Sequence, residues 1–146
     1  MIDKTPIEET KKLRFTSKLE NITLVEKLID DVCDLHAINR DYYGNILVAL
    51  TEAVNNAISH GNMLNPEKHV TLLFESKKDN IRFLVSDEGE GFDFNHLPDP
   101  TSPENLEKPY GRGIFLMKHL SDEVEFTDNG RTVQISFKVP SPVGAN

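Results

Sequence analysis

Three short stretches of this sequence place side chains where they could do chemistry, and the first lies on a helix predicted at 45–61. Glu52 and Asn56 are four residues apart, so on a helix their side chains project side by side. A carboxylate can serve as a general base, and an amide oxygen is an acceptable ligand for Mg²⁺. An amphipathic helix with a merely solvated polar face would show the same pair, so both interpretations stay open at this point.

The second stretch reads Asp-Glu-Gly-Glu-Gly-Phe at 87–92 and follows a predicted strand. Asp87 could accept a hydrogen bond from an exocyclic amine, and Gly89 and Gly91 would let the backbone approach a flat ligand that a Cβ would obstruct. A tight acidic turn is the plainer interpretation. A calcium loop is disfavoured, because in the EF-hand register a glycine stands at the third position and no glutamate occupies the twelfth.

The third stretch is formed by Gly111, Arg112 and Gly113, where a further helix is predicted to begin. Free N–H groups at a helix N-terminus favour phosphate, and Lys108 and Arg112 are reasonable phosphate contacts on charge grounds. The chain has no GxxxxGK[ST] motif, and the third glycine and preceding strand of a dinucleotide-binding fingerprint are missing. A pair of glycines alone is therefore weak support for a phosphate site.

The elements that must position these stretches follow from the periodicity of the apolar residues. In chain order we expect a strand at about 11–19, helices at about 23–36 and 45–61, strands at 69–76 and 80–87, a helix from about 111, and two strands within 123–139 joined by a turn at 128–130. Hairpins joined by helices imply an α+β two-layer sandwich, in which a mixed, mostly antiparallel sheet carries its helices on one face.

Each element is expected to bury one apolar face. The predicted buried residues are Leu13 and Phe15 in the first strand, Leu24, Leu28, Val32 and Leu35 in the first helix, Leu47, Leu50, Val54 and Ile58 in the second helix, and Ile81, Phe83 and Val85 in the third strand. Asn21 is expected to cap the first helix, the segment 38–44 to be a short connection, and residues 1–10 to be a loose start.

Size and composition narrow the function classes. The 146 residues suit a single domain, with an ordered core at about 13–139 and a flexible tail at 140–146. A net charge of −8 argues against a nucleic-acid partner, and no apolar run approaches the roughly 20 residues of a membrane span. A single cysteine, Cys33, and the lack of a secretory signal favour the cytoplasm. The five histidines form no HExxH motif, which disfavours a zinc site.

Together the three stretches resemble the GHKL ATPases, the histidine kinase-like ATP-binding superfamily that includes gyrase, histidine kinases and MutL. The resemblance rests on Glu-x-x-x-Asn on a helix, Asp-x-Gly-x-Gly after a strand, a long loop and then Gly-x-Gly into a helix, and it covers about 15–139. The sequences EAVNNAISHGN, DEGEGFD and GRGIFLM look most like the small stand-alone branch, the RsbW-like anti-sigma-factor serine kinases of bacteria.

This resemblance implies a Bergerat-type ATP-binding fold and roles for the matched residues around the phosphates. Glu52 would be the general base that activates the attacking hydroxyl, and Asn56 would coordinate Mg²⁺. Gly111 and Gly113 would close on the phosphates of ATP beneath a mobile lid at about 93–110.

For the base of the nucleotide, the resemblance implies that Asp87 holds the adenine amino group. Gly89 and Gly91 would shape the base pocket, and His60 and Gly61 match the end of the first motif, where their role is structural.

The resemblance further implies a serine/threonine protein kinase that phosphorylates a STAS-type antagonist protein in a bacterial partner-switching pathway. The alternative is a non-catalytic, ATP-gated module that sequesters a sigma factor or another regulator. In this branch an early arginine in the first helix often helps to bind the sigma factor, whereas here that helix carries only Lys27. A homodimer through Leu13, Phe15 and the first helix is also possible.

Overall fold

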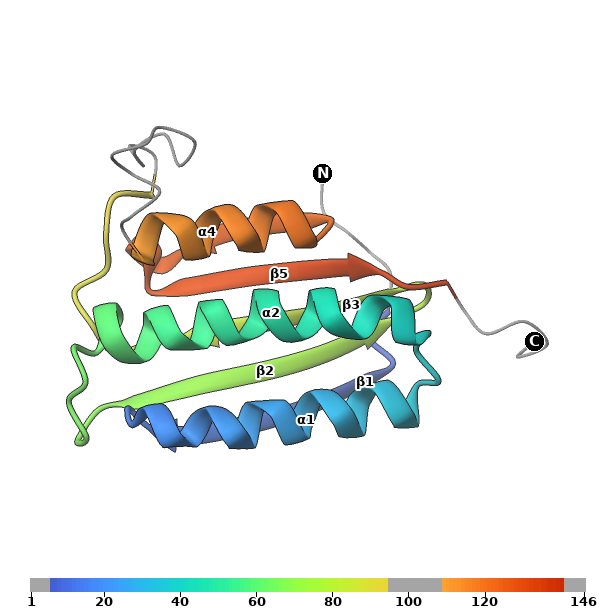
Figure 1. Cartoon of the computed structure of the whole chain (residues 1–146), viewed down its shortest axis with the longest axis horizontal. Helices are drawn as coiled ribbons and strands as arrows, with labels where there is room; N and C mark the ends of the chain where they lie inside the picture. The colour runs from blue at the N-terminus through green and yellow to red at the C-terminus, as the bar shows by residue number, and fades with distance from the viewer. Residues whose placement is uncertain (1–5, 95–108, 141–146) are drawn as a thin grey trace.

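The computed structural model describes residues 6–94 and 109–140, which form a five-stranded sheet covered on one face by helices (Figure 1). The elements are β1 (Glu9–Thr16), a 3₁₀ turn (Leu19–Asn21), α1 (Ile22–Leu35), α2 (Arg40–Asn56), a π-helical turn η2 (Ala57–Gly61), β2 (His69–Lys77), β3 (Asn80–Ser86), α4 (Pro109–Leu120), β4 (Glu123–Thr127), a 3₁₀ turn (Asp128–Gly130) and β5 (Thr132–Lys138). No helix in these two ranges is long and apolar enough to span a membrane.

The sheet has the strand order β1-β2-β3-β5-β4, and each of its four pairings is antiparallel. The two predicted hairpins, β2–β3 and β4–β5, are both present. The second hairpin joins the first through β3 and β5, so the start of β5 lies beside the end of β3. The α+β two-layer prediction is confirmed, and the sheet is antiparallel wherever it is described.

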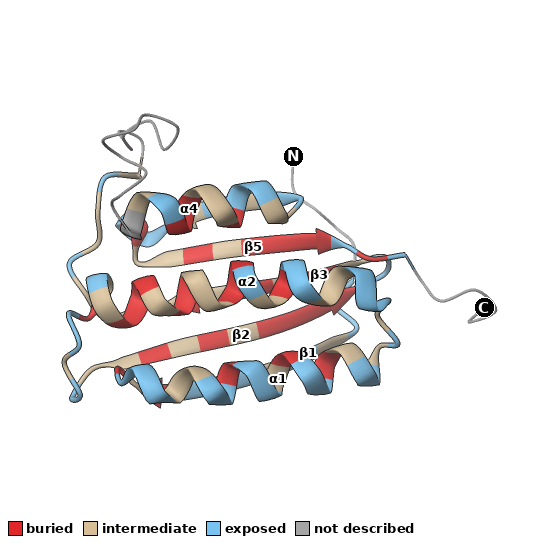
Figure 2. Cartoon of the chain, in the orientation of Figure 1, coloured by how far each residue is buried: buried red, intermediate tan, exposed pale blue. Residues whose placement is uncertain are grey.

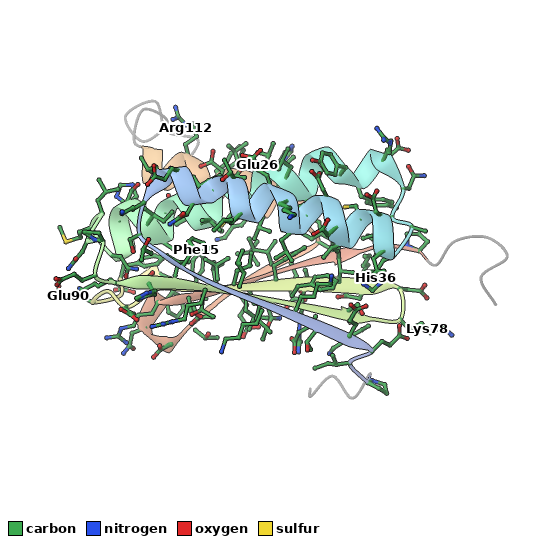
Figure 3. All side chains as sticks on the ribbon, turned by 90° about the horizontal axis from the view of Figure 1, so that it is seen from below. Phe15, Glu26, His36, Lys78, Glu90 and Arg112 are labelled. Carbon is green, nitrogen blue, oxygen red and sulfur yellow. The ribbon has the colours of Figure 1, made fainter. Side chains whose placement is uncertain are left out.

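The core lies between the helices and the inner face of the sheet (Figures 2 and 3). Phe15 on β1 projects into this layer, as predicted, and is 5% exposed. The predicted face of β3 is also confirmed, because Ile81, Phe83 and Val85 are all buried. Aromatic rings continue across the strands, with the Phe83 centroid 5.3 Å from that of Phe74. Such alternation commits one sheet face to the core and leaves the other to solvent.

The predicted buried stripe of the first helix is right only in part. Val32 is fully buried and Leu28 is half-buried, as predicted, but Leu24 and Leu35 are 42% and 60% exposed. Val25 and Ile29 are fully buried in their place. The sequence contains two overlapping apolar stripes at helical spacing, and the rotation that faces the sheet buries the β-branched stripe.

Several element boundaries also differ from the prediction. β1 already begins at Glu9, and α2 begins at Arg40, so the supposed connection at 38–44 is mostly helical. Asn39 caps α2, since its side-chain oxygen accepts a hydrogen bond from the Asp41 N–H at 2.9 Å. Asn21 does precede α1, but its side chain makes no cap hydrogen bond and instead donates to the Thr16 carbonyl.

In α2 the buried face is shifted by one residue at its start, because Ile46 is fully buried and Leu47 only half-buried. The remaining predicted residues of this stripe, Leu50, Val54 and Ile58, are fully buried. α4 begins at Pro109, two residues before the predicted start.

Candidate functional site

A cavity of about 480 Å³ opens at the end of the sandwich where α2 passes into η2. Its apolar wall comes from α4 and the sheet and includes Val85, Ile114, Met117, Phe126 and Val133. Two groups of polar residues and glycines lie at the cavity or pack against the residues that line it. We call them the helix side (Glu52, Asn56 and Gly113) and the loop side (Gly61, Asn62, 87–92 and Arg131).

On the helix side, α4 packs closely against α2 through Gly113. A Cβ at Gly113 would lie 2.9 Å from Glu52 Oε2 and 3.1 Å from Asn56 Nδ2. Glycine therefore lets the first turns of α4 approach both polar side chains, which the sequence had paired by their spacing alone.

Asn56 is 8% exposed, which disfavours the alternative of a merely solvated polar face on this helix. Its Nδ2 is buried and has no hydrogen-bond partner in the described part of the chain. Buried polar atoms without partners are uncommon in folded proteins, because each one costs free energy. An orphaned amide that lines a cavity is thus placed to bind a polar ligand.

On the loop side, Asp87 follows β3 and is fixed by backbone bonds. Its N–H donates to the Arg131 carbonyl at 2.9 Å, and its Oδ1 accepts from the Gly89 N–H at 2.8 Å. Burial raises the pKa of the Asp87 carboxyl above its ordinary value of 3.8, although the Gly89 hydrogen bond and the Arg131 charge both act to lower it. The carboxylate is therefore partly desolvated at the cavity wall.

The loop-side glycines allow contacts between backbone segments. A Cβ at Gly61 would lie 2.3 Å from Asp87 Oδ2, and one at Gly89 would lie 2.0 Å from the Gly61 carbonyl oxygen. Gly91 has φ of +82°, and a Cβ there would lie 2.1 Å from the Asn129 carbonyl oxygen. The described contacts of Gly89 and Gly91 are with other backbone segments of the protein, whereas the approach to a flat ligand predicted for these two glycines stays a prediction.

Two loop-side residues were not predicted as part of the site. Arg131 donates from Nε to the Gly89 carbonyl at 2.8 Å and from Nη2 to the Glu90 carbonyl at 3.4 Å. Asn62 donates to two other segments and accepts from the Glu88 N–H. Four of these five contacts span more than twenty residues of sequence, so no local pattern around Asn62 or Arg131 could have predicted them.

Five of the predicted site residues line the cavity, namely Asn56, His60, Gly61, Asp87 and Gly91. Three others do not line it but pack against residues that do: Glu52 and Gly113 lie against each other beside Asn56, and Gly89 lies against Gly61 and Asp87.

The remaining predicted residues lie beside the cavity or away from it. Gly111 is half-buried in the first turn of α4, and Arg112 is exposed there, with its side chain turned away from the sheet (Figure 3). Lys108, most of the predicted lid at 93–110, and the tail beyond residue 140 lie outside the described residues.

Comparison with known proteins identifies the fold and the family. The family described as "Histidine kinase-like ATPase domain" matches residues 15–137. The chain belongs to this family. Such a domain implies ATP binding, in agreement with the resemblance of the three sequence stretches to the GHKL ATPases.

The relatives lie within the RsbW-like branch. The serine-protein kinase RsbW of Staphylococcus epidermidis is 30% identical over 132 residues, which cover 85% of this chain and 83% of the relative. RsbW of Staphylococcus aureus strain JH9 is 26% identical over 137 residues, covering 88% and 86%. Among solved structures, the RsbU and RsbW domains of Rv1364c from Mycobacterium tuberculosis share the fold, with a TM-score of 0.67 and 14% identity. That match covers 92% of this chain and 33% of the larger protein.

The residues at the cavity fit ATP. The volume lies in the range of small-molecule sites, and an apolar wall with a few polar groups is typical of them. No three His, Cys, Asp or Glu side chains gather into a metal-ligating group within residues 6–94 and 109–140. A Mg²⁺ ion here would therefore be held by Asn56 together with oxygens of phosphate and water, the coordination this ion commonly accepts.

Proposed function

We propose that this protein is an ATP-dependent serine/threonine protein kinase that phosphorylates a STAS-type antagonist protein in a bacterial partner-switching pathway. The observation that carries the proposal is the helix side of the cavity, where Gly113 brings α4 against both Glu52 and Asn56. The kinship with proteins named serine-protein kinase RsbW supports the reaction class and the kind of partner.

Recognition of the base would fall to the loop side. Asp87 would accept a hydrogen bond from the adenine amino group, and Gly89 and Gly91 would leave room for the ring. The apolar wall, including Met117 and Val133, would bury the base. Removing the Asp87 acceptor would leave a desolvated amine without a partner, which costs about 1–3 kcal/mol.

The triphosphate would lie toward the start of α4. Asn56 would provide an oxygen ligand to Mg²⁺, which when bound neutralises developing charge on the phosphates. The N–H groups near Gly111, in the first turn of α4, would donate to phosphate oxygens, helped by the positive end of the helix dipole. Gly113 is the fifth residue of α4 and lies beyond the four N–H groups that a helix start leaves free, so its contribution would be the close approach of α4 to Glu52 and Asn56. Arg112, exposed in the first turn of α4, would add positive charge, as would Lys108, which lies outside the described residues.

The transfer itself needs one more group, the carboxylate of Glu52. It would accept the proton of a serine or threonine hydroxyl while the hydroxyl oxygen forms a bond to the γ-phosphorus. The bond from this phosphorus to the bridging oxygen breaks, and ADP leaves. General base catalysis contributes about 10²- to 10⁴-fold, and positioning supplies most of the remainder.

The test compares wild type with Glu52→Gln, using purified protein, Mg²⁺ and γ-labelled ATP with lysate of the source cell or purified STAS-type proteins. Glu125→Gln is a matched control, because Glu125 lies exposed on β4. We expect a small labelled acceptor protein with wild type and with the control but not with Glu52→Gln, while calorimetry shows ATP binding in all three.

An absence of label with wild type, despite ATP binding, would contradict the kinase proposal and leave a nucleotide-gated module that binds a regulator such as a sigma factor. Failure of ATP to bind would contradict the assignment of the whole cavity.

A further inference from the structure

Asn62 is buried to an unusual degree for a residue that follows a helix end. It is 1% exposed, whereas its neighbours Met63 and Leu64 are 80% and 51% exposed. Its Nδ2 donates to Ser17 Oγ at 2.7 Å and to the His69 carbonyl at 3.0 Å. A buried amide with both donor hydrogens in use is fixed in orientation.

The third hydrogen bond of the Asn62 side chain joins it to the loop that carries Asp87. Asn62 Oδ1 accepts from the Glu88 N–H at 2.7 Å, so the peptide group that joins Asp87 to Glu88 is held from the side of η2. The Glu88 carboxylate strengthens this connection by accepting from the His69 N–H at 3.2 Å and pairing with Arg14 at 3.5 Å. The end of the long helix is thereby tied to the loop that carries Asp87.

The backbone next to Asn62 is strained. The π-helical turn is closed by the Asn62 N–H donating to the Ala57 carbonyl and the Leu64 N–H donating to the Ile58 carbonyl, both at 2.8 Å. Met63 and Leu64 then adopt φ values of +53° and +59°. Bulky residues rarely enter the left-handed region, and such strain persists where surrounding contacts enforce it. The exposed side chains of both residues gain little from this conformation, whereas Asn62 gains its three bonds.

We infer that Asn62 is a positioning residue that aims the Asp87 carboxylate at the adenine amino group. The inference rests on the proposed function, in which Asp87 recognises adenine. Without the Asn62 acceptor, the Glu88 N–H loses its partner and the 87–88 peptide can rotate, which moves the adjacent carboxylate. The helix side would be unaffected, because the bonds of Asn62 run to Ser17, His69 and Glu88 and to none of its residues.

The test measures dissociation constants for ATP and for purine riboside 5′-triphosphate, which lacks the 6-amino group, with Mg²⁺ present. We expect wild type to bind ATP about tenfold more tightly than the analogue, and Asn62→Ala to lose this preference through weaker ATP binding alone. Asn62→Asp keeps an oxygen for the Glu88 N–H, so it should keep the preference even though its stability falls with the two lost donors.

Asn65→Ala is the matched control, because the Asn65 side chain lies in an exposed turn, where its oxygen accepts from the N–H of the nearby Glu67. If Asn62→Ala does not fold, Asn62→Ser replaces it, since its hydroxyl is too short to reach the Glu88 N–H. Equal weakening of both nucleotides in the Asn62 variant would overturn the inference and leave a purely structural asparagine. A wild type without preference for ATP would instead overturn the role of Asp87, and with it the inference.

Discussion

The two sides of the cavity use buried asparagines in opposite ways. On the loop side, Asn62 has every strong hydrogen-bonding position of its amide satisfied by the protein. On the helix side, six residues earlier, the Asn56 Nδ2 is buried without a partner in the described residues. Without ligand, the buried amide of the loop side has its hydrogen bonds, whereas the buried amide of the helix side leaves a donor unpaired among the described residues. Incomplete hydrogen bonding of this kind marks where folding stability has been given up for function.

The largest loss of stability is expected when a loop-side glycine is replaced by alanine, which adds one methyl group. In Gly89→Ala the new Cβ would meet the backbone carbonyl of Gly61, which cannot move aside as a side chain can. We expect a loss of about 3 kcal/mol in the free energy of unfolding, measured by urea denaturation, together with loss of ATP binding. Gly44→Ala is the control, since Gly44 is exposed on α2 and nothing lies within 4 Å of a Cβ placed there. This variant should gain about 0.5–1 kcal/mol in the free energy of unfolding.

The same substitution on the helix side should separate activity from stability. In Gly113→Ala the Cβ would meet only the ends of the Glu52 and Asn56 side chains, which can rotate away. We expect stability equal to or above wild type, because alanine favours the helix, and phosphate transfer reduced about 100-fold by misplacement of both groups. A variant that unfolds like Gly89→Ala would show that the two sides are packed alike.

The asparagines themselves can be compared by replacing each with leucine, which has nearly the same shape. Asn62→Leu removes three hydrogen bonds and should cost about 2 kcal/mol of unfolding free energy. Asn56→Leu removes a buried amide nitrogen that has no partner, so the ligand-free protein should lie within about 1 kcal/mol of wild type or be more stable. Similar losses in thermal or urea unfolding of the two variants would contradict the contrast.

The smallest effect concerns the pH dependence of stability. Because burial raises the pKa of Asp87 above its ordinary 3.8, the folded state binds this proton more tightly than the unfolded state. Ionisation of Asp87 therefore lowers stability as the pH rises through the interval between the unfolded and the folded pKa. Ligand-free Asp87→Asn should melt above wild type at about pH 7, and the difference should shrink as the pH falls toward 3.8.

Sequence patterns predicted the architecture and the common face of Glu52 and Asn56, because both depend on local spacing. The four-residue interval between Glu52 and Asn56 sets their common face, and alternation set the inner face of β3. The buried face of the first helix was predicted only in part, because Leu24 and Val25 begin two overlapping apolar stripes at helical spacing. Only packing against the sheet decides which of the two stripes is buried. The early start of α2 could have been predicted from Asn39, whose cap is a local signal.

The loop side could be predicted only in part. Gly89 and Gly91 were recognisable as glycines after a strand, but Asn62 and Arg131 act on backbone groups that the chain reaches 26 and 42 residues away. Such contacts depend on the order in which β2, β3 and β5 pair. A single sequence does not state that order, so residues that organise the loop look like ordinary turn residues.

The π-helical turn at Ala57–Gly61 makes chain length, as much as residue type, a constraint on this protein. Its hydrogen bonds span five residues where an α-helix spans four, so one residue is accommodated without rotating the turns before it. Winding the same residues as an α-helix would turn Gly61 and Asn62 by about 100° relative to Glu52. The number of residues between Glu52 and Asn62 and the type of this turn are therefore coupled, so a one-residue deletion here should be tolerated only where the π turn becomes an α-helix.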